Sequence, residues 1–285
     1  MKKLYKDIRF TKGILTLTAG LLIAGCSAED ELGNNSSAQQ LNMIPMVNDL
    51  QKSRANDEDA LHEKTLSKLD FKMFEPEFGK CCVNHQSSSP AENQAEVLGK
   101  NNWKVDLNLQ EDHSYNYYAV ANAQADLSKK TLEELQAATQ QDNDIWQPYP
   151  QAKDKKFLMS AKGQYIISKD PIQDIPVELV RAAAKIKLNL SSSVNGYNMT
   201  SVNWKFLNYN TNTSVFAGQT AKPNIESNNE DNTVDKIEAN KCSVTTYSYS
   251  TTWTSQEDAP KIAVKVVFQS KDNKNDTREK ELTIP

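Results

Sequence analysis

The chain is poor in the residues on which most catalytic and nucleotide-binding motifs depend. It has nine glycines and three histidines in 285 residues. It contains no glycine-rich phosphate loop, no Gly-x-Ser-x-Gly motif and no His-Glu-x-x-His motif. The histidines, His62, His85 and His113, each stand among polar neighbours. The sequence therefore predicts a protein that is not an enzyme and binds no cofactor. With glycine scarce and asparagine plentiful, we expect Asn to serve many of the turns.

Long hydrophobic runs are also scarce, and the longest lies close to the N-terminus. A lysine-rich segment precedes the apolar residues 14–23, and small residues lead to Cys26. This order is typical of a secretory signal, and the run is too short for a stable membrane-spanning helix. Residues 23–26 read IAGC and resemble a bacterial lipobox. We therefore expect residues 1–25 to be removed and Cys26 to carry an anchoring lipid. An ordinary signal peptide with an unrelated cysteine is the alternative.

Basic residues are not in excess, and the processed chain is acidic. Removing residues 1–25 takes away five basic residues and one acidic residue, so the formal net charge changes from −4 to −8. Nucleic-acid binding requires a basic surface, and this balance argues against it. The segment 226–235 is rich in acids, but it lacks the glycine and the final Glu of an EF-hand loop. We expect it to be a solvated loop within a longer loop, 218–240.

The four cysteines cannot all serve in a disulfide scaffold. With Cys26 assigned to lipid, Cys81, Cys82 and Cys242 remain, and an odd number cannot be fully paired. One bridge from Cys81 or Cys82 to Cys242 suits an oxidising compartment, and plain packing of free thiols is the alternative. A metal site at Cys81, Cys82 and His85 is disfavoured, because the sequence contains no second ligand cluster.

What the chain does contain is a dense series of alternating apolar residues. Period-two alternation with one apolar face marks half-buried strands. Such segments lie at 69–73, 103–109, 115–121, 177–179, 182–190, 202–206, 247–249 and 262–266. A further strand is expected at 157–160. Only residues 128–140 favour a helix, with Thr131 and Glu134 at the spacing of a capping box. The sequence therefore predicts a mainly β fold of the β-sandwich type.

Two prolines, Pro171 and Pro176, mark an expected boundary between two domains. We expect a first β-sandwich over residues 55–173, which includes the helix, and a second over residues 174–285. Ahead of them, residues 27–40 are polar and acidic, as in a flexible tether. Residues 41–50 form an apolar patch. Pro45 has no N–H to donate and is expected to restrict this patch to the edge of a sheet.

Several short segments carry a family resemblance. Residues 54–57 read RAND and resemble a site at which an Arg-specific protease trims an N-terminal strand. Residues 118–122 (YAVAN) resemble a strand that precedes a helix, and 157–161 (FLMSA) resemble a Met-Ser strand. Residues 177–186 (VELVRAAAKI) resemble an Arg-x-x-Ala-Lys-Ile strand that opens a second domain. In this order, over nearly the whole chain, the segments resemble the fimbrillin superfamily of Bacteroidetes-type bacteria, the lipoprotein-derived (type V) pilins.

The resemblance implies two transthyretin-like β-sandwich domains behind a lipid tether. In that family the precursor is exported as a lipoprotein, and cleavage removes the N-terminal segment that carries the lipid. The emptied groove then accepts a strand from the next subunit, a form of β-augmentation. Here the removed segment corresponds to residues 26–54, with cleavage between Arg54 and Ala55 and the 41–50 patch as the leaving strand. An exposed linker Arg54 without a role in processing is the alternative.

The end of the chain departs from the family pattern. Family members usually continue beyond a strand such as residues 280–284 to an end segment used in polymerisation, whereas this chain ends at Pro285. The second sandwich is therefore expected to be incomplete. A truncated member, a minor subunit with different assembly and an incomplete reading frame are all compatible with this ending.

The resemblance predicts a structural subunit of a cell-surface fimbria that supports adhesion. Its expected partners are other fimbrial subunits, outer-membrane lipid through acylated Cys26, a maturation protease, and receptors on host or bacterial surfaces. Its expected location is the surface of the cell outer membrane. The competing hypothesis is a monomeric surface lipoprotein that keeps its lipid and binds glycan or a host protein through its loops.

Overall fold

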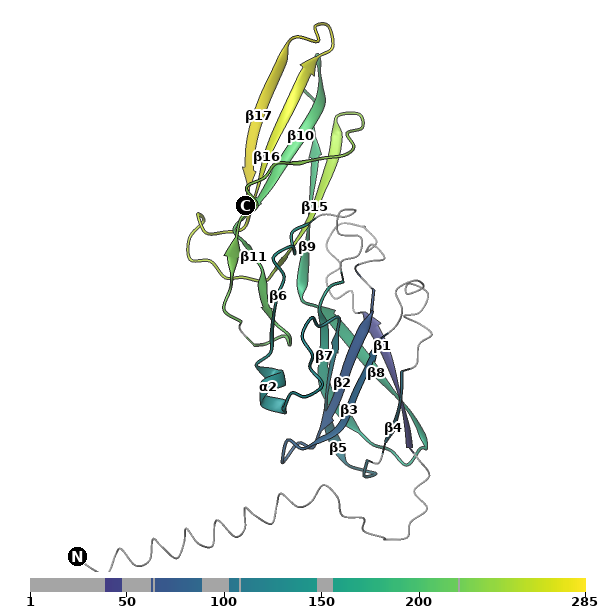
Figure 1. The fold of residues 1–285 in the computed structure, drawn as a ribbon. Coiled ribbons are helices and arrows are strands. Elements are labelled where there is room, and N and C mark those ends of the chain that lie inside the picture. The colour runs from purple at the N-terminus through teal and green to yellow at the C-terminus, as the bar shows by residue number, and fades with distance from the viewer. Residues whose placement is uncertain are drawn as a thin grey trace, which may run out of the picture. The chain divides into compact units, whose positions relative to one another are not determined.

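The computed structural model describes residues 39–47, 63, 65–88, 103–107, 109–147, 156–219 and 221–285. Within these residues the protein is mainly β, with several sheets and one five-residue helix, α2 (Leu132–Gln136). This result confirms the predicted fold class (Figure 1). In the same part of the chain, no helix reaches the length and apolarity needed to cross a membrane.

Seven strands form one mixed sheet, in the order β3-β2-β5-β7-β8-β1-β4. The strands are β1 (Gln39–Val47), β2 (Lys68–Phe74), β3 (Cys81–Ser88), β4 (Trp103–Leu107), β5 (Ser114–Ala121), β7 (Met159–Ile166) and β8 (Ile172–Arg181). Neighbouring strands are antiparallel except for β1 and β8, which run parallel. Residues of the two outer strands, β3 and β4, contact each other, so the sheet folds back on itself.

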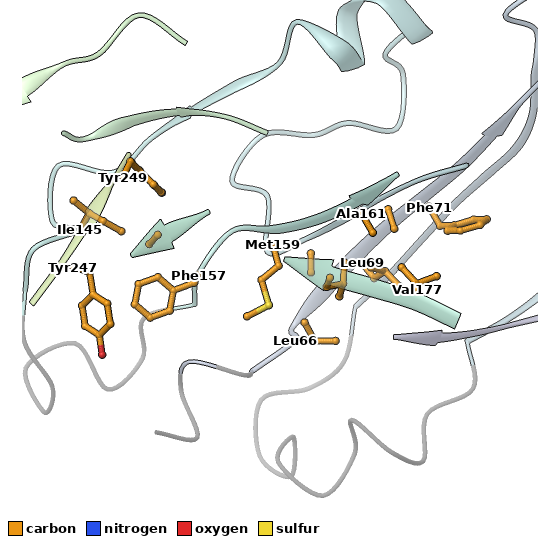
Figure 2. Close-up of a cluster of buried hydrophobic side chains, with 14 of the residues drawn as sticks. Leu66, Leu69, Phe71, Ile145, Phe157, Met159, Ala161, Val177, Tyr247 and Tyr249 are labelled. Atoms are coloured by element: carbon orange, nitrogen blue, oxygen red, sulfur yellow. The ribbon is translucent and has the colours of Figure 1, made fainter. Parts of the chain in front are cut away.

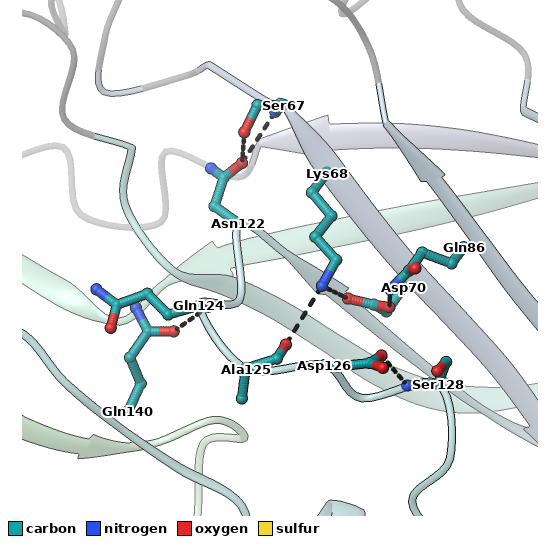
Figure 3. A network of polar contacts seen from close by, with 10 residues as sticks. All are labelled: Ser67, Lys68, Asp70, Gln86, Asn122, Gln124, Ala125, Asp126, Ser128 and Gln140. Carbon is teal, nitrogen blue, oxygen red and sulfur yellow. Dashed lines mark hydrogen bonds and ion pairs between the residues drawn. The ribbon is translucent and has the colours of Figure 1, made fainter.

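The alternation that predicts β2 holds for its apolar residues but not for its polar ones. Leu69, Phe71 and Met73 are fully buried, as expected. Asp70 and Lys72 are also buried, because the segment that follows β5 covers the other face of the strand. The ammonium group of Lys72 donates to the carbonyls of Ser128 and Lys130. Asp70 pairs with Lys68 and accepts from Gln86 (Figure 3).

Asparagine takes left-handed turn positions, as the shortage of glycine predicts. Asn122, Asn208 and Asn240 have φ values of 60°, 58° and 59°. The conformation is tolerated best by glycine, and next by asparagine because its short amide bonds locally. Asn122 shows the second use of this side chain: its amide oxygen accepts from the backbone N–H and hydroxyl of Ser67 (Figure 3).

The predicted helix exists, but it is shorter than the predicted range 128–140. Thr131 caps it, and the reciprocal hydrogen bonds between Thr131 and Glu134 confirm the capping box. Leu135 is its one fully buried residue and packs in a cluster with Tyr118 and Phe216. The helix ends at Gln136 because the chain next forms β6 (Thr139–Gln141), which pairs with β12 (Asn212–Ser214).

The C-terminal half contains two four-stranded sheets, β14-β10-β16-β17 and β13-β11-β15-β9. Their long strands are β9 (Ala183–Ser191), β10 (Tyr197–Leu207), β15 (Lys241–Tyr249), β16 (Lys261–Ser270) and β17 (Thr277–Ile284); β11 (Tyr209–Asn210), β13 (Ile225–Glu226) and β14 (Asn232–Thr233) are two-residue strands. The predicted alternating residues form the core, including Val202, Trp204, Phe206, Val264 and Val266. Apart from β13 and β14, the segment 218–240 is loop where it is described.

The chain passes from the first sheet to the sheets of the C-terminal half between β8, which ends at Arg181, and β9, which begins at Ala183. Most of β8 lies after position 173, yet β8 pairs with β1 and β7 and so belongs to the first sheet. The next strand, β9, pairs with β15 in the C-terminal half. Residues 38–285 form one unit of mutual contacts, and the division into two domains stays a prediction.

Candidate assembly site

Strand β1, which contains most of the predicted leaving strand, lies inside the seven-stranded sheet. It pairs in parallel with β8 over eight residues, from Gln40 opposite Ile172 to Val47 opposite Leu179. On its other side, Gln39–Met43 pair antiparallel with β4. β1 therefore bridges β8 and β4 through main-chain hydrogen bonds on two sides (Figure 1).

Alternate side chains of β1 enter the core. Leu41 and Met43 are 1% and 0% exposed, whereas Met46 is 41% exposed. On β8 the residues opposite Met43 and Pro45 are Ile175 and Val177, and both are fully buried. Burying one such side chain stabilises a fold by about 1.5–3 kcal/mol. Part of the core is thus supplied by a strand that lies at the very start of the described chain.

Pro45 lies beyond the part of β1 that is described as paired with β4. The pairing with β4 ends at Met43, so from Ile44 onward the described structure gives β1 a partner on the β8 side alone. For Pro45 itself the edge position stays a prediction, because the residues that precede β4 lie outside the described part of the chain. The predicted edge position is wrong for β1 as a whole, because β4 pairs with its residues Gln39–Met43. This described pairing stops before Pro45, so it requires no N–H from the proline.

Strand β4 depends on β1 for its place. Within the described residues, the only ladder that includes β4 is the one with β1, five residues long. By contrast, β8 is fixed independently at its start, where Gln173 closes the turn before it. Its amide donates to the carbonyls of Ser168 and Asp170 and accepts from the N–H of Ser168. We call the two strands that flank β1, β8 and β4, the seat of β1. Strand β8 is therefore in place without β1, whereas β4 is held by β1 itself.

The outer face of β8 is acidic. Asp174 and Glu178 are exposed there, between the buried residues of the strand. Burial raises the pKa of the Tyr117 phenol, and the negative charge of Glu178 raises it further. Burial also raises the pKa of the Tyr165 phenol, and the charge of Asp174 adds to this effect. Both phenols therefore stay protonated at neutral pH and add no charge to this surface.

The three described cysteines form no disulfide bridge. Cys81, Cys82 and Cys242 all lie in the described part of the chain and are free thiols, so the alternative of packed, unpaired cysteines applies. Cys82 is the extra residue of a β-bulge opposite β2. Among the described residues, no group of three or more His, Cys, Asp and Glu side chains could hold a metal ion.

The residues predicted to be chemically processed lie outside the described residues. These are Cys26, the lipid attachment residue, and Arg54 and Ala55, which flank the predicted cut. His62 and the side chain of Trp103 also lie outside them. The site therefore consists of β1 and its two neighbours. The sequence indicated β1 through its apolar patch, but it gave no sign that β4 would be the second neighbour.

Comparison with known proteins establishes the fold. No protein-family model matches the sequence, and no curated protein sequence matches it. Among solved structures, a candidate cell adhesion protein from Parabacteroides distasonis superposes with a TM-score of 0.56 at 14% identity, over 87% of this chain and 80% of that chain. The tip fimbrial protein Mfa3 from Porphyromonas gingivalis gives a TM-score of 0.55 at 15% identity, over 86% and 81% of the two chains. The chain has the fold of Bacteroidetes fimbrial proteins.

A third structure with this fimbrial fold is the fimbrilin FimA from Porphyromonas gingivalis, with a TM-score of 0.50 and 12% identity over 86% of this chain and 80% of that chain. The three structures are fimbrial and cell adhesion proteins rather than enzymes. The resemblance found in the sequence is confirmed at the level of the fold.

Proposed function

We propose that the protein is a structural subunit of a cell-surface fimbria, exported as a lipoprotein and assembled by β-strand exchange. The observation that carries the proposal is the position of β1. It is an N-terminal strand with buried alternate side chains, yet it is joined to the sheet by main-chain hydrogen bonds on two sides. A strand held in this way can be replaced by another strand with the same spacing of apolar residues.

The processing steps of the proposal follow from sequence. Acylation of Cys26 anchors the precursor in the outer membrane, and a cut after Arg54 separates the lipid and β1 from the rest of the chain. The cut lies in the segment between β1 and β2, so the other described strands stay in one covalent piece. The partners in this proposal are other fimbrial subunits and the maturation protease.

The fimbrial fold supports a role in attachment and gives no reason to assign catalysis. The alternative is a monomeric surface lipoprotein that captures glycan or a host protein. One observation favours it: Trp253 is 51% exposed in the loop after β15, where an aromatic ring is available for contact. The two functions differ in the fate of the N-terminus, since the binding lipoprotein keeps Cys26 and its lipid.

The test is the N-terminus and intact mass of the protein recovered from the cell surface. We expect wild type to begin at Ala55 without lipid and to be present in fibres. Arg54→Ala should retain acylated Cys26 and stay out of fibres, because its removable segment is still attached. Lys52→Ala, a change of a neighbouring basic residue, should behave as wild type. A wild-type chain that begins at acylated Cys26 would favour the binding lipoprotein and overturn strand exchange.

A further inference from the structure

A buried carboxylate lies where the described chain resumes before β2. Glu63 has no exposed surface. Its Oε2 is 3.2 Å from Nη1 of Arg181, its Oε1 is 3.0 Å from Nζ of Lys185, and Oε1 also accepts a short hydrogen bond from the hydroxyl of Tyr247. These four residues are called the Glu63 cluster below. A buried acid needs such partners, since an unpaired charge in the interior is strongly unfavourable.

The cluster joins Glu63 to strands that lie 118 to 184 residues away in the sequence. Arg181 is the last residue of β8, Lys185 belongs to β9 and Tyr247 belongs to β15. The centroids of the Phe157 and Tyr247 rings lie 4.7 Å apart (Figure 2). The guanidinium group of Arg181 lies 5.9 Å from the centroid of the Phe157 ring. Apolar rings next to the ion pairs limit access of water and strengthen the electrostatic attraction.

The residues after Glu63 are held as well. The side-chain amide of Asn122 donates to the carbonyl of Thr65 and its oxygen accepts from the N–H of Ser67. Leu66, between them, is 5% exposed and belongs to the main core cluster. The polar contacts of Glu63, Thr65 and Ser67 attach the chain to β8, β9, β15 and the turn after β5 rather than to β1. Leu66 shares its core cluster with residues of β1 as well.

We propose that the Glu63 cluster is a retention point of the processed chain: it holds the new N-terminal part against the sheets while β1 is released. This inference rests on the proposed function. Strand β8 contacts the part of the chain before the predicted cut and the part after it in different ways. It binds β1 through main-chain bonds at residues 172–179 and binds Glu63 through the side chain of Arg181. Loss of β1 therefore leaves the bonds of Glu63 in place.

The experiment uses the full chain and an Arg-specific protease, followed by an aminopeptidase that shortens the new N-terminus. The sequence has four arginines, at positions 9, 54, 181 and 278, so the products are identified by intact mass. The variants are Glu63→Gln, which removes the charge, and Tyr247→Phe, which removes one hydrogen bond. The control is Glu279→Gln, which changes an exposed acid paired with Lys265. Melting curves check that each variant is folded.

In wild type and the control, shortening should stop at or before Glu63. In Glu63→Gln, residue 63 should be lost about tenfold faster, because opening of the segment is less costly without the buried ion pairs. Tyr247→Phe should lie between the two, and it provides the answer if Glu63→Gln does not fold. Suppose that wild type is cut and releases β1, but that the folded variants lose residue 63 at the same rate as wild type. The retention role of the Glu63 cluster is then wrong, and the proposed strand exchange is not contradicted. If wild type is not cut between β1 and Glu63, both are wrong.

Discussion

At the residue scale, the two adjacent thiols of β3 differ in their surroundings. Cys81 is exposed, whereas Cys82 is half-buried with its Sγ 3.6 Å from Oε1 of Glu75. Burial, and next the carboxylate of Glu75, raise the pKa of Cys82 to about 11. Burial also raises the pKa of Cys81, but Lys72 partly offsets it. Because the thiolate is the reactive form, Cys82 should be the less reactive of the two at neutral pH.

This difference can be measured by alkylation and mass spectrometry. At pH 8 we expect Cys81 to react at least about tenfold faster than Cys82, with the gap narrowing as the pH approaches 11. Glu75→Gln removes a negative charge, which lowers the pKa of Cys82 and speeds its alkylation. Glu77→Gln, a nearby exposed acid, should change little. Equal rates for both thiols at pH 8 would contradict the assigned surroundings of Cys82.

At the element scale, the position of β4 depends on β1, and β1 is held in the sheet by its buried side chains. Met43→Asp should detach β1 from the sheet, because burying an unpaired carboxylate at this position costs about 3 kcal/mol or more of folding free energy. Hydrogen exchange should then show loss of protection at β4 as well as β1, since β4 pairs with β1, while β16 stays protected. Met46→Asp, at an exposed position of the same strand, is the matched control. Protection of β4 in Met43→Asp would mean that β4 does not depend on β1.

The same scale shows what the sequence could predict and what it could not. Strands β2, β5, β10, β15 and β16 were predictable because their apolar residues alternate, and the capping box was predictable because its bonds are local. The Glu63 cluster was not, because Glu63 is 118 residues from Arg181 and 184 from Tyr247. A lone Glu beside a His in polar sequence carries no local sign of burial. The order of the seven strands was hidden for the same reason.

At the scale of the whole molecule, charge disfavours one way of pairing two copies of this chain, edge to edge through β17. On β17, Arg278 and Lys280 lie on the face of the sheet that also carries Val266 of β16, while Glu279 and Glu281 lie on the other. Antiparallel pairing of two β17 edges brings the same face of each strand together, so like charges meet and the pairing is disfavoured. As far as the structure describes it, the β17 edge is therefore poorly suited to self-association, which favours the seat of β1 as the place for the strand exchange proposed above.

The seat itself can be tested with a peptide of residues 39–47. The chain cut after Arg54 and freed of β1 should melt at a lower temperature than the intact chain, because the partners of Leu41 and Met43 lose their contacts. At a concentration of 100 times its Kd, the peptide should restore about 2.7 kcal/mol. For a body of this size that corresponds to a rise in Tm of about 5–10 °C. A peptide with Met43→Asp should give no rise, since its charge cannot enter the buried position. If the wild-type peptide also gave none, β1 would be a fixed part of the fold, and the groove beside β8 would not accept a strand.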